Sequence, residues 1–228
     1  MNKTAILIFC RSAKKESGCK KLHANAKINQ GLHLALYNKT IKVAQESGFP
    51  YFLVDENLQT GNNFGEKISN AIASVFQKKF ENIIVAGSDC PQLSAGILLN
   101  AADKLNDAPM VAGPDVKGGI YLLGISRSVF DPKAFSEIPW QTNKVCKALL
   151  QYCTSFSNNF FLIEKLNDLN TQADFYFLKS IRKATHQFIH LIVSIITGGK
   201  NITPSVLYSI NSLRFSNTKQ FRAPPVFF

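Results

Sequence analysis

Asp89 is the side chain of this sequence whose position points most directly to chemistry. It follows the apolar run of residues 83–86 and Gly87, and Pro91 comes two residues later. An apolar run ended by glycine and proline is typical of a strand buried on both faces of a parallel sheet. Ligands of open α/β sheets bind outside the carboxyl ends of the strands. We therefore expect the Asp89 carboxylate to project into a ligand site; the alternative is a cap or turn residue at the end of the strand.

Gly118 and Gly119 form a second candidate site, between the apolar segments 109–112 and 120–125. Paired glycines let the backbone approach a ligand closely and expose amide groups to phosphate oxygens. Lys117, just before them, would add a positive charge for phosphate. The alternative is a tight turn or bulge between adjacent strands. The glycine pair alone favours this alternative.

The segments that carry these residues belong to an alternation of strand and helix patterns. Strand patterns cover residues 4–10, 49–54, 83–86, 109–112, 120–125 and 160–163. Helix patterns cover residues 32–47, 64–80, 96–105, 143–152 and 171–183. The alternation predicts an α/β fold with a mainly parallel central sheet and helices on both faces.

The composition is that of a folded globular chain. Its 228 residues are 46% hydrophobic and 18% charged, enough for one large α/β domain with an appendage. No apolar run approaches the roughly 18–20 residues that a membrane span needs, and the first residues do not resemble a secretory signal. The five cysteines form no CxxC pair, which argues against a disulfide framework or zinc site and favours the cytoplasm.

The net charge of +11 is concentrated near the C-terminus. After Asp174 the sequence has seven basic residues and no acidic one. We divide the chain into a domain over residues 1–183 and a basic extension over residues 184–228. A basic extension can contact nucleic acid or an anionic surface. A solvated or partner-covered tail is the commoner outcome, so we do not expect a nucleic-acid partner.

Several motifs, in the right order, resemble the bacterial glycosyltransferase-A-like family known as domain of unknown function 2064, or selenodomain-associated transferase 1. The family pattern Gly-Ser-Asp-Cys-Pro-x-Leu is matched by residues 87–93. Its pattern Gly-Pro-x-x-Asp-Gly-Gly-Tyr-Tyr-Leu-Leu-Gly is matched, with two changes, by residues 113–124. Residues 64–67, 138–140 and 166–174 resemble further family segments. The resemblance covers about residues 4–180.

The resemblance implies a nucleotide-diphospho-sugar transferase fold and a nucleotide-activated donor. It also implies a divalent cation, Mg²⁺ or Mn²⁺, that bridges the donor diphosphate and a carboxylate. Asp89 stands where that carboxylate is expected, and Asp168 is the candidate for a second ligand. Both are predicted to be catalytic and metal-binding, although an aspartate before Thr171 can equally help to start a helix. Glycosyl transfer is favoured over nucleotidyl transfer; the acceptor and the oligomeric state stay open.

The family's N-terminal loop, rich in proline, glycine and lysine, implies a phosphate cradle at residues 11–22. The predicted nucleotide- and phosphate-binding residues are Arg11, Lys20, Lys21, Ser88, Lys117, Gly118 and Gly119. Lys117 stands where the family has an aspartate that would face Asp89, and Asn170 replaces another aspartate. These changes leave a second hypothesis, a catalytically impaired protein that still binds nucleotides. A third hypothesis is binding of nucleic acid or an anionic surface through the basic extension.

Overall fold

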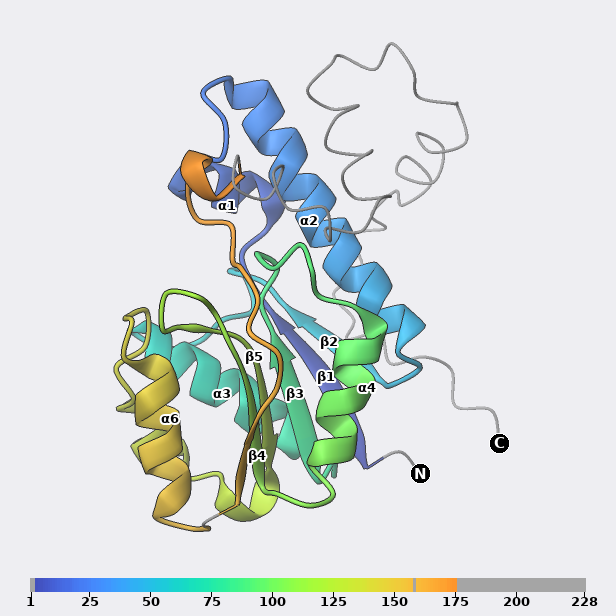
Figure 1. Ribbon diagram of the computed structural model, residues 1–228, viewed down its shortest axis with the longest axis vertical. Coiled ribbons are helices and arrows are strands. Elements are labelled where there is room, and N and C mark those ends of the chain that lie inside the picture. Colours follow the sequence, from blue (N-terminus) through green and yellow to red (C-terminus); the bar gives the residue numbers. More distant parts are fainter. Residues whose placement is uncertain (1–2, 158, 176–228) are drawn as a thin grey trace.

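The computed structural model of this chain describes residues 3–157 and 159–175 (Figure 1). The predicted boundary between residues 183 and 184, and the basic extension, lie outside these residues. Of the helix predicted over residues 171–183, the described part is helical from residue 172 to residue 175.

A six-stranded sheet forms the centre of the described fold, in the order β2-β1-β3-β5-β4-β6. Its strands are β1 (Thr4–Phe9), β2 (Tyr51–Val54), β3 (Asn82–Ala86), β4 (Met110–Pro114), β5 (Ile120–Ser126) and β6 (Phe160–Leu162). Within this sheet β5 runs antiparallel to β3 and β4, and the other pairings are parallel. The predicted α/β fold with a mainly parallel sheet is thus confirmed.

Helices connect these strands. They are α1 (Ala13–Cys19), α2 (Ala26–Glu46), α3 (Phe64–Phe76), α4 (Ala95–Lys104), α5 (Pro132–Ser136) and α6 (Val145–Thr154), with a 3₁₀ turn at Arg127–Val129. The helix predicted from residue 32 begins earlier, because Asn25 caps it by accepting a hydrogen bond from the Ile28 N–H. The helix predicted to residue 80 ends at Phe76, and Lys79 has a left-handed φ of 68° that a helix cannot continue through. Of the helices in the described part of the chain, none combines the length and apolar character needed to cross a bilayer.

The central strand β1 buries side chains on both faces of the sheet. Ala5, Leu7 and Phe9 pack in one apolar cluster with residues of α3, α5 and α6. Ile6 and Ile8 pack in a second cluster with residues of α2 and α4. A strand covered on both faces is apolar throughout rather than alternating, which explains the continuous apolar pattern of residues 4–10.

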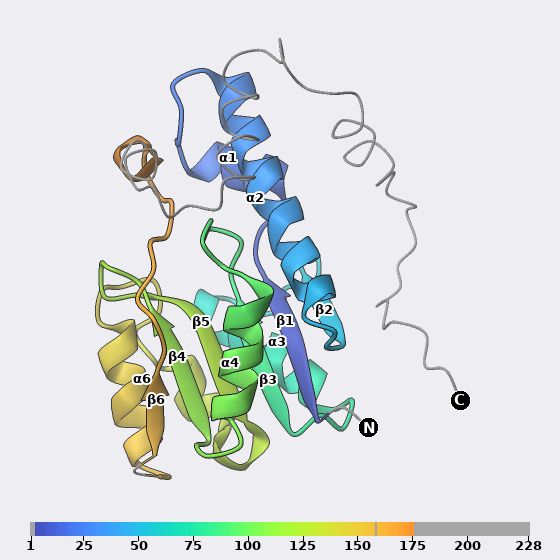
Figure 2. The same cartoon turned by 45° about the vertical axis from the view of Figure 1, so that its right-hand side comes forward.

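The switch in strand order lies between β1 and β3. The chain leaves β1 toward β2 on one side and later returns to place β3 on the other side. In doubly wound sheets the crevice outside the carboxyl ends of two such strands is where ligands bind. Residues 10–12 leave β1 there, and residues 87–91 leave β3 there. Figures 1 and 2 show α1 and the segment after β6 at this same edge of the sheet.

Candidate functional site

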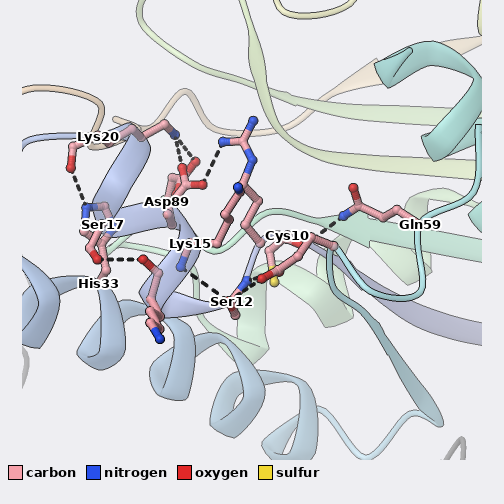
Figure 3. A network of polar contacts seen from close by, with 12 residues as sticks. Cys10, Ser12, Lys15, Ser17, Lys20, His33, Gln59 and Asp89 are labelled. Carbon is pink, nitrogen blue, oxygen red and sulfur yellow. Dashed lines mark hydrogen bonds and ion pairs between the residues drawn. The ribbon is translucent and has the colours of Figure 1, made fainter. Parts of the chain in front are cut away.

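Asp89 lies in a cluster of four ionic side chains at the carboxyl edge of β1 and β3. Lys20 Nζ is 2.5 Å from Asp89 Oδ2 and 3.0 Å from Glu16 Oε1. Figure 3 shows the Lys20 and Asp89 side chains pointing toward one another. Arg11 Nη1 donates a hydrogen bond to Glu16 Oε2 at 2.9 Å. We call Arg11, Glu16, Lys20 and Asp89 the ionic cluster.

Helix α1 places Glu16 and Lys20 in this cluster, where the sequence predicted a phosphate loop. Ser12 begins the helix, since its Oγ accepts a hydrogen bond from the Lys15 N–H. The Ser12 N–H and hydroxyl both donate to the Glu56 carboxylate, which anchors the start of α1 to the loop after β2. Glu16 and Lys20 are four residues apart and so lie on one side of the helix. Glu16 is a residue that sequence reasoning missed, and this spacing was the available signal.

Helix α2 fixes the backbone at the end of α1. The buried Asn29 amide donates hydrogen bonds to the Ser17 and Lys20 carbonyls at 2.9 and 3.0 Å. Its Oδ1 accepts from the Leu22 N–H at 2.7 Å. His33 Nε2, also buried, lies 3.2 Å from the Lys20 carbonyl. The Lys20 backbone is therefore held by two side chains of α2, as Figure 3 shows for His33.

In the ionic cluster, burial and the partners of opposite charge act on each pKa in opposite directions. Burial alone would raise the pKa of Glu16, but Lys20 and Arg11 outweigh burial and hold this pKa below its usual value. Burial would lower the pKa of Lys20, and the carboxylates of Asp89 and Glu16 raise it instead. For Asp89 burial dominates and raises the pKa, while Lys20 offsets only part of this effect. An additional cation beside Asp89 would offset the remaining cost of burying its negative charge.

Asp168 reaches Asp89 from the segment that follows β6. The Leu169 N–H donates to the Asp89 carbonyl at 2.9 Å, so the two segments run side by side. Asp168 Oδ1 is buried and has no hydrogen-bond partner among the described residues. Burial, reinforced by the negative charges of Asp89 and Asp115, raises the pKa of Asp168 to about 7. Thr171, not Asp168, caps the helical turn over residues 172–175, since its Oγ1 accepts a hydrogen bond from the Asp174 N–H at 3.3 Å.

The loop from Asp115 to Gly119 is a tight turn organised by its own aspartate. Asp115 Oδ1 accepts hydrogen bonds from the Lys117 and Gly119 N–H groups, each at 2.7 Å. Gly118 has a left-handed φ of 91°, and a Cβ there would lie 2.3 Å from the Asn143 carbonyl oxygen. A tight turn between adjacent strands, the alternative given for the glycine pair, therefore accounts for both glycines. Their contact with phosphate stays a prediction.

The remaining predicted phosphate-binding residues differ in their surroundings. Lys117 Nζ contacts both carboxylate oxygens of Asp174 at 2.7 Å, so the cation that faces Asp89 is Lys20. Lys21 is exposed and forms no ion pair within the described residues. Ser88 is buried beside the Cys10 thiol, whose pKa burial raises to about 12. A thiol with this pKa stays protonated and is a poor metal ligand at neutral pH.

The two aspartates fit a divalent cation of the Mg²⁺ or Mn²⁺ type. Both offer carboxylate oxygens, which these hard cations prefer, and Asp168 Oδ1 is an unpartnered acceptor in a buried place. Among the described residues no group of three or more side chains could hold a metal ion. Mg²⁺ is commonly held by one or two carboxylates together with substrate phosphates and water. The pair Asp89 and Asp168 matches this mode of binding.

Comparison with known proteins agrees with the fold and with the sequence resemblance. Residues 33–142 match the family described as "Uncharacterized protein conserved in bacteria (DUF2064)", which confirms the resemblance. No curated protein matches the sequence. A crystal structure of a candidate nucleotide-diphospho-sugar transferase from Desulfovibrio desulfuricans G20 superimposes with a TM-score of 0.72 at 18% identity, covering 87% of this chain and 99% of that one. A cytidylyltransferase from Leptospira borgpetersenii serovar Hardjo-bovis is more distant, with a TM-score of 0.46 at 15% identity over 97% of this chain and 100% of that one.

Proposed function

We propose that this protein, whose residues 33–142 match the DUF2064 family of bacterial proteins, is a metal-dependent transferase that uses a nucleotide-activated donor. The observation that carries the proposal is the hydrogen bond from the Leu169 N–H to the Asp89 carbonyl, which brings the segment of Asp168 to the carboxyl edge of the sheet beside Asp89 and Lys20. Glycosyl transfer is our first choice over nucleotidyl transfer, since the structure with the TM-score of 0.72 is a candidate nucleotide-diphospho-sugar transferase. The five cysteines are free, in line with a cytoplasmic enzyme.

Asp89 and Asp168 are the residues that would hold the cation. When bound, Mg²⁺ or Mn²⁺ would neutralise the negative charge that develops on the leaving phosphate. The cation would also give the buried Asp168 Oδ1 the partner it lacks and would offset the mutual repulsion of the two carboxylates. Both aspartates would therefore act in their ionised forms.

Lys20 and Arg11 would bind and orient the donor phosphates. Once a cation neutralises Asp89, the Lys20 ammonium group is free to turn toward a phosphate oxygen. Its backbone is held by Asn29, so only the side chain has to move. Arg11 is anchored by Glu16 and keeps part of its guanidinium group exposed to a ligand. Two preplaced cations lower the cost of ordering the site when the donor arrives.

Thermal unfolding with a panel of nucleotides and nucleotide sugars, with and without Mn²⁺, tests this proposal. A donor at a hundredfold excess over its Kd should raise the free energy of unfolding by about 2.7 kcal/mol. The increase should need the metal and should vanish in Asp89→Asn. Asp107→Asn, a change at an exposed aspartate after α4, is the matched control and should respond as the unmodified protein does.

Three results would distinguish the alternatives. A metal-independent shift that Asp89→Asn leaves intact would indicate a nucleotide-binding protein without this catalysis. No shift with any nucleotide would contradict both ideas. For an active protein, the released product identifies the reaction, because nucleotidyl transfer from a nucleoside triphosphate releases pyrophosphate and glycosyl transfer releases the nucleotide of the donor.

A further inference from the structure

Lys117, a cation where the family resemblance leads one to expect an aspartate, has a specific partner in Asp174. Its Nζ lies 2.7 Å from each carboxylate oxygen of Asp174. The Asp174 side chain is only 17% exposed, against 46% for Lys117. The Asn170 and Thr171 N–H groups donate to the same carboxylate at 3.0 and 2.9 Å. The ion pair therefore ties the loop after β4 to the turn that precedes residue 172.

Residues 166–174, which we call the strap, carry Asp168 along the carboxyl edge of the sheet. Besides the ion pair, three backbone contacts hold the strap: the Leu166 N–H to the Pro114 carbonyl at 3.2 Å, the Asn167 N–H to Gln92 Oε1 at 3.3 Å, and the Leu169 N–H to the Asp89 carbonyl at 2.9 Å. These contacts lie at or before residue 169. Lys117 anchors the second half of the strap through Asp174, and the buried side chain of Phe175 holds the chain directly after the strap.

The other end of the ion pair rests on a rigid support. The Lys117 N–H donates to Asp115 Oδ1, and Asp115 is buried at the end of β4. Gly118 packs against the Asn143 carbonyl, with no room for a side chain. The backbone of Lys117 is therefore fixed relative to the sheet, so its side chain can hold the strap in one place.

Asp168 needs such an anchor because its surroundings repel its charge. Asp168 lies beside Asp89, because its neighbour Leu169 donates its N–H to the Asp89 carbonyl, and two carboxylates close together repel one another. The ionised Asp168 is thus pushed away from Asp89 unless the strap holds it there. A cation would bind the two carboxylates together only where both are already in reach.

We propose that Lys117 is a positioning residue: through Asp174 it holds the strap so that Asp168 stays beside Asp89. This inference rests on the proposed function, since it gives Lys117 a part in assembling the metal site. Lys117 then acts through Asp174 and needs no contact with the donor. Lys117 stands in place of an aspartate of the family pattern. It compensates for the loss of that carboxylate by keeping the Asp168 carboxylate in position.

Binding of Mn²⁺ alone to the full-length protein, followed by the spin-resonance signal of the free ion, tests the proposal. We expect Lys117→Met and Asp174→Asn each to weaken Mn²⁺ binding about fivefold, the scale of one partly exposed ion pair. The double variant should be no weaker than either single one, because both changes break the same interaction. Lys117→Arg should restore most of the affinity. Lys147→Met, which removes an exposed lysine of α6, is the control of equal charge.

The direction of the effect separates this proposal from its competitors. A purely long-range effect of charge predicts tighter Mn²⁺ binding in Lys117→Met, because a repelling cation has been removed. A merely structural ion pair predicts a lower Tm with unchanged Mn²⁺ affinity. Either result would overturn the proposal. Asp174→Asn keeps one side-chain oxygen for the Asn170 and Thr171 N–H groups but removes a negative charge, so its weaker binding alone does not exclude a charge effect. If Lys117→Met does not fold, Lys117→Gln repeats the test.

Failure of the proposed function can be told apart from failure of this inference. If the unmodified protein binds no Mn²⁺, either alone or together with a nucleoside diphosphate, the metal-dependent function is wrong as stated. The strap is then tested by hydrogen exchange of the Leu169 amide, which bonds to the Asp89 carbonyl. Faster exchange in Lys117→Met, and not in Lys147→Met, supports positioning by Lys117; equal exchange overturns it.

Discussion

Replacing Asp168 by asparagine should stabilise the protein at alkaline pH, because it removes a charge that the fold accommodates poorly. The pKa of this carboxyl is raised from 3.8 to about 7 by burial and by the neighbouring charges of Asp89 and Asp115. The folded state thus binds the proton more tightly than the unfolded state, so stability falls as the pH rises from about 4 to 7. At 1.36 kcal/mol per pKa unit, the loss has an upper bound of about 4 kcal/mol.

Urea unfolding at pH 5 and pH 8 measures this difference. Trp140, the single tryptophan, packs against Phe64 and Phe135 and so reports loss of the core by its fluorescence. Between pH 5 and pH 8 the unmodified protein should lose about 2–3 kcal/mol relative to Asp168→Asn. Asp107→Asn is the control, since its exposed side chain lies outside the site.

Adding Mn²⁺ at pH 8 should then reverse the order of stability. The metal compensates the charge of Asp168 in the unmodified protein and has one carboxylate fewer to bind in Asp168→Asn. The measured quantity is the difference in free energy of unfolding between Asp168→Asn and the unmodified protein. The reasoning fails if this difference is the same at pH 8 as at pH 5. In that case Asp168 carries no uncompensated charge, and the case for a metal ligand at this position loses its physical basis.

Two further substitutions test the site from other sides. Lys20→Met removes the cation 2.5 Å from Asp89. Calorimetry should therefore show tighter binding of Mn²⁺ alone and about tenfold weaker binding of a nucleoside diphosphate. Unchanged affinities for both would exclude Lys20 from the site. Asp115→Ala leaves the Lys117 and Gly119 N–H groups without their acceptor and should lower the free energy of unfolding in urea by about 2–4 kcal/mol. Asp115→Asn keeps one acceptor oxygen and should cost less, and an equal cost would contradict this explanation of the turn.

The fold was predictable because its strands and long helices have strong local patterns. The continuous apolar run of β1 and the capped, periodic α4 needed no knowledge of their neighbours. Helix α1 was missed, because it is short and depends on the anchoring of Ser12 by Glu56, a contact 44 residues apart in sequence. The antiparallel direction of β5 was missed as well, since a strand buried on both faces shows no sign of its direction.

The candidate site was predictable only in part. The strand pattern alone places Asp89 at the carboxyl edge of the sheet, and Lys117 was predicted from its place beside the glycine pair. Asp168, Arg11, Lys20 and Lys21 came from the family resemblance. The pairing of Lys117 with Asp174 joins residues 57 positions apart, and no local pattern predicts such a contact. The neighbours of Asp89 likewise depend on how the segments cross at the edge of the sheet. Long-range ionic contacts of this kind require the folded structure.

The ionic cluster also determines which small molecules the candidate site would attract. Arg11 and Lys20 supply two positive charges and Glu16 and Asp89 two negative ones, so the cluster is neutral in a chain whose net charge is +11. Opposite charges in contact cancel beyond a short distance and leave little field to draw in other ions. Free phosphate therefore gains little by entering. A nucleotide that arrives with its metal, as we propose, would offer the metal to Asp89 and a phosphate to Lys20 while Arg11 stays paired with Glu16, so it would gain more from the site than a bare anion does.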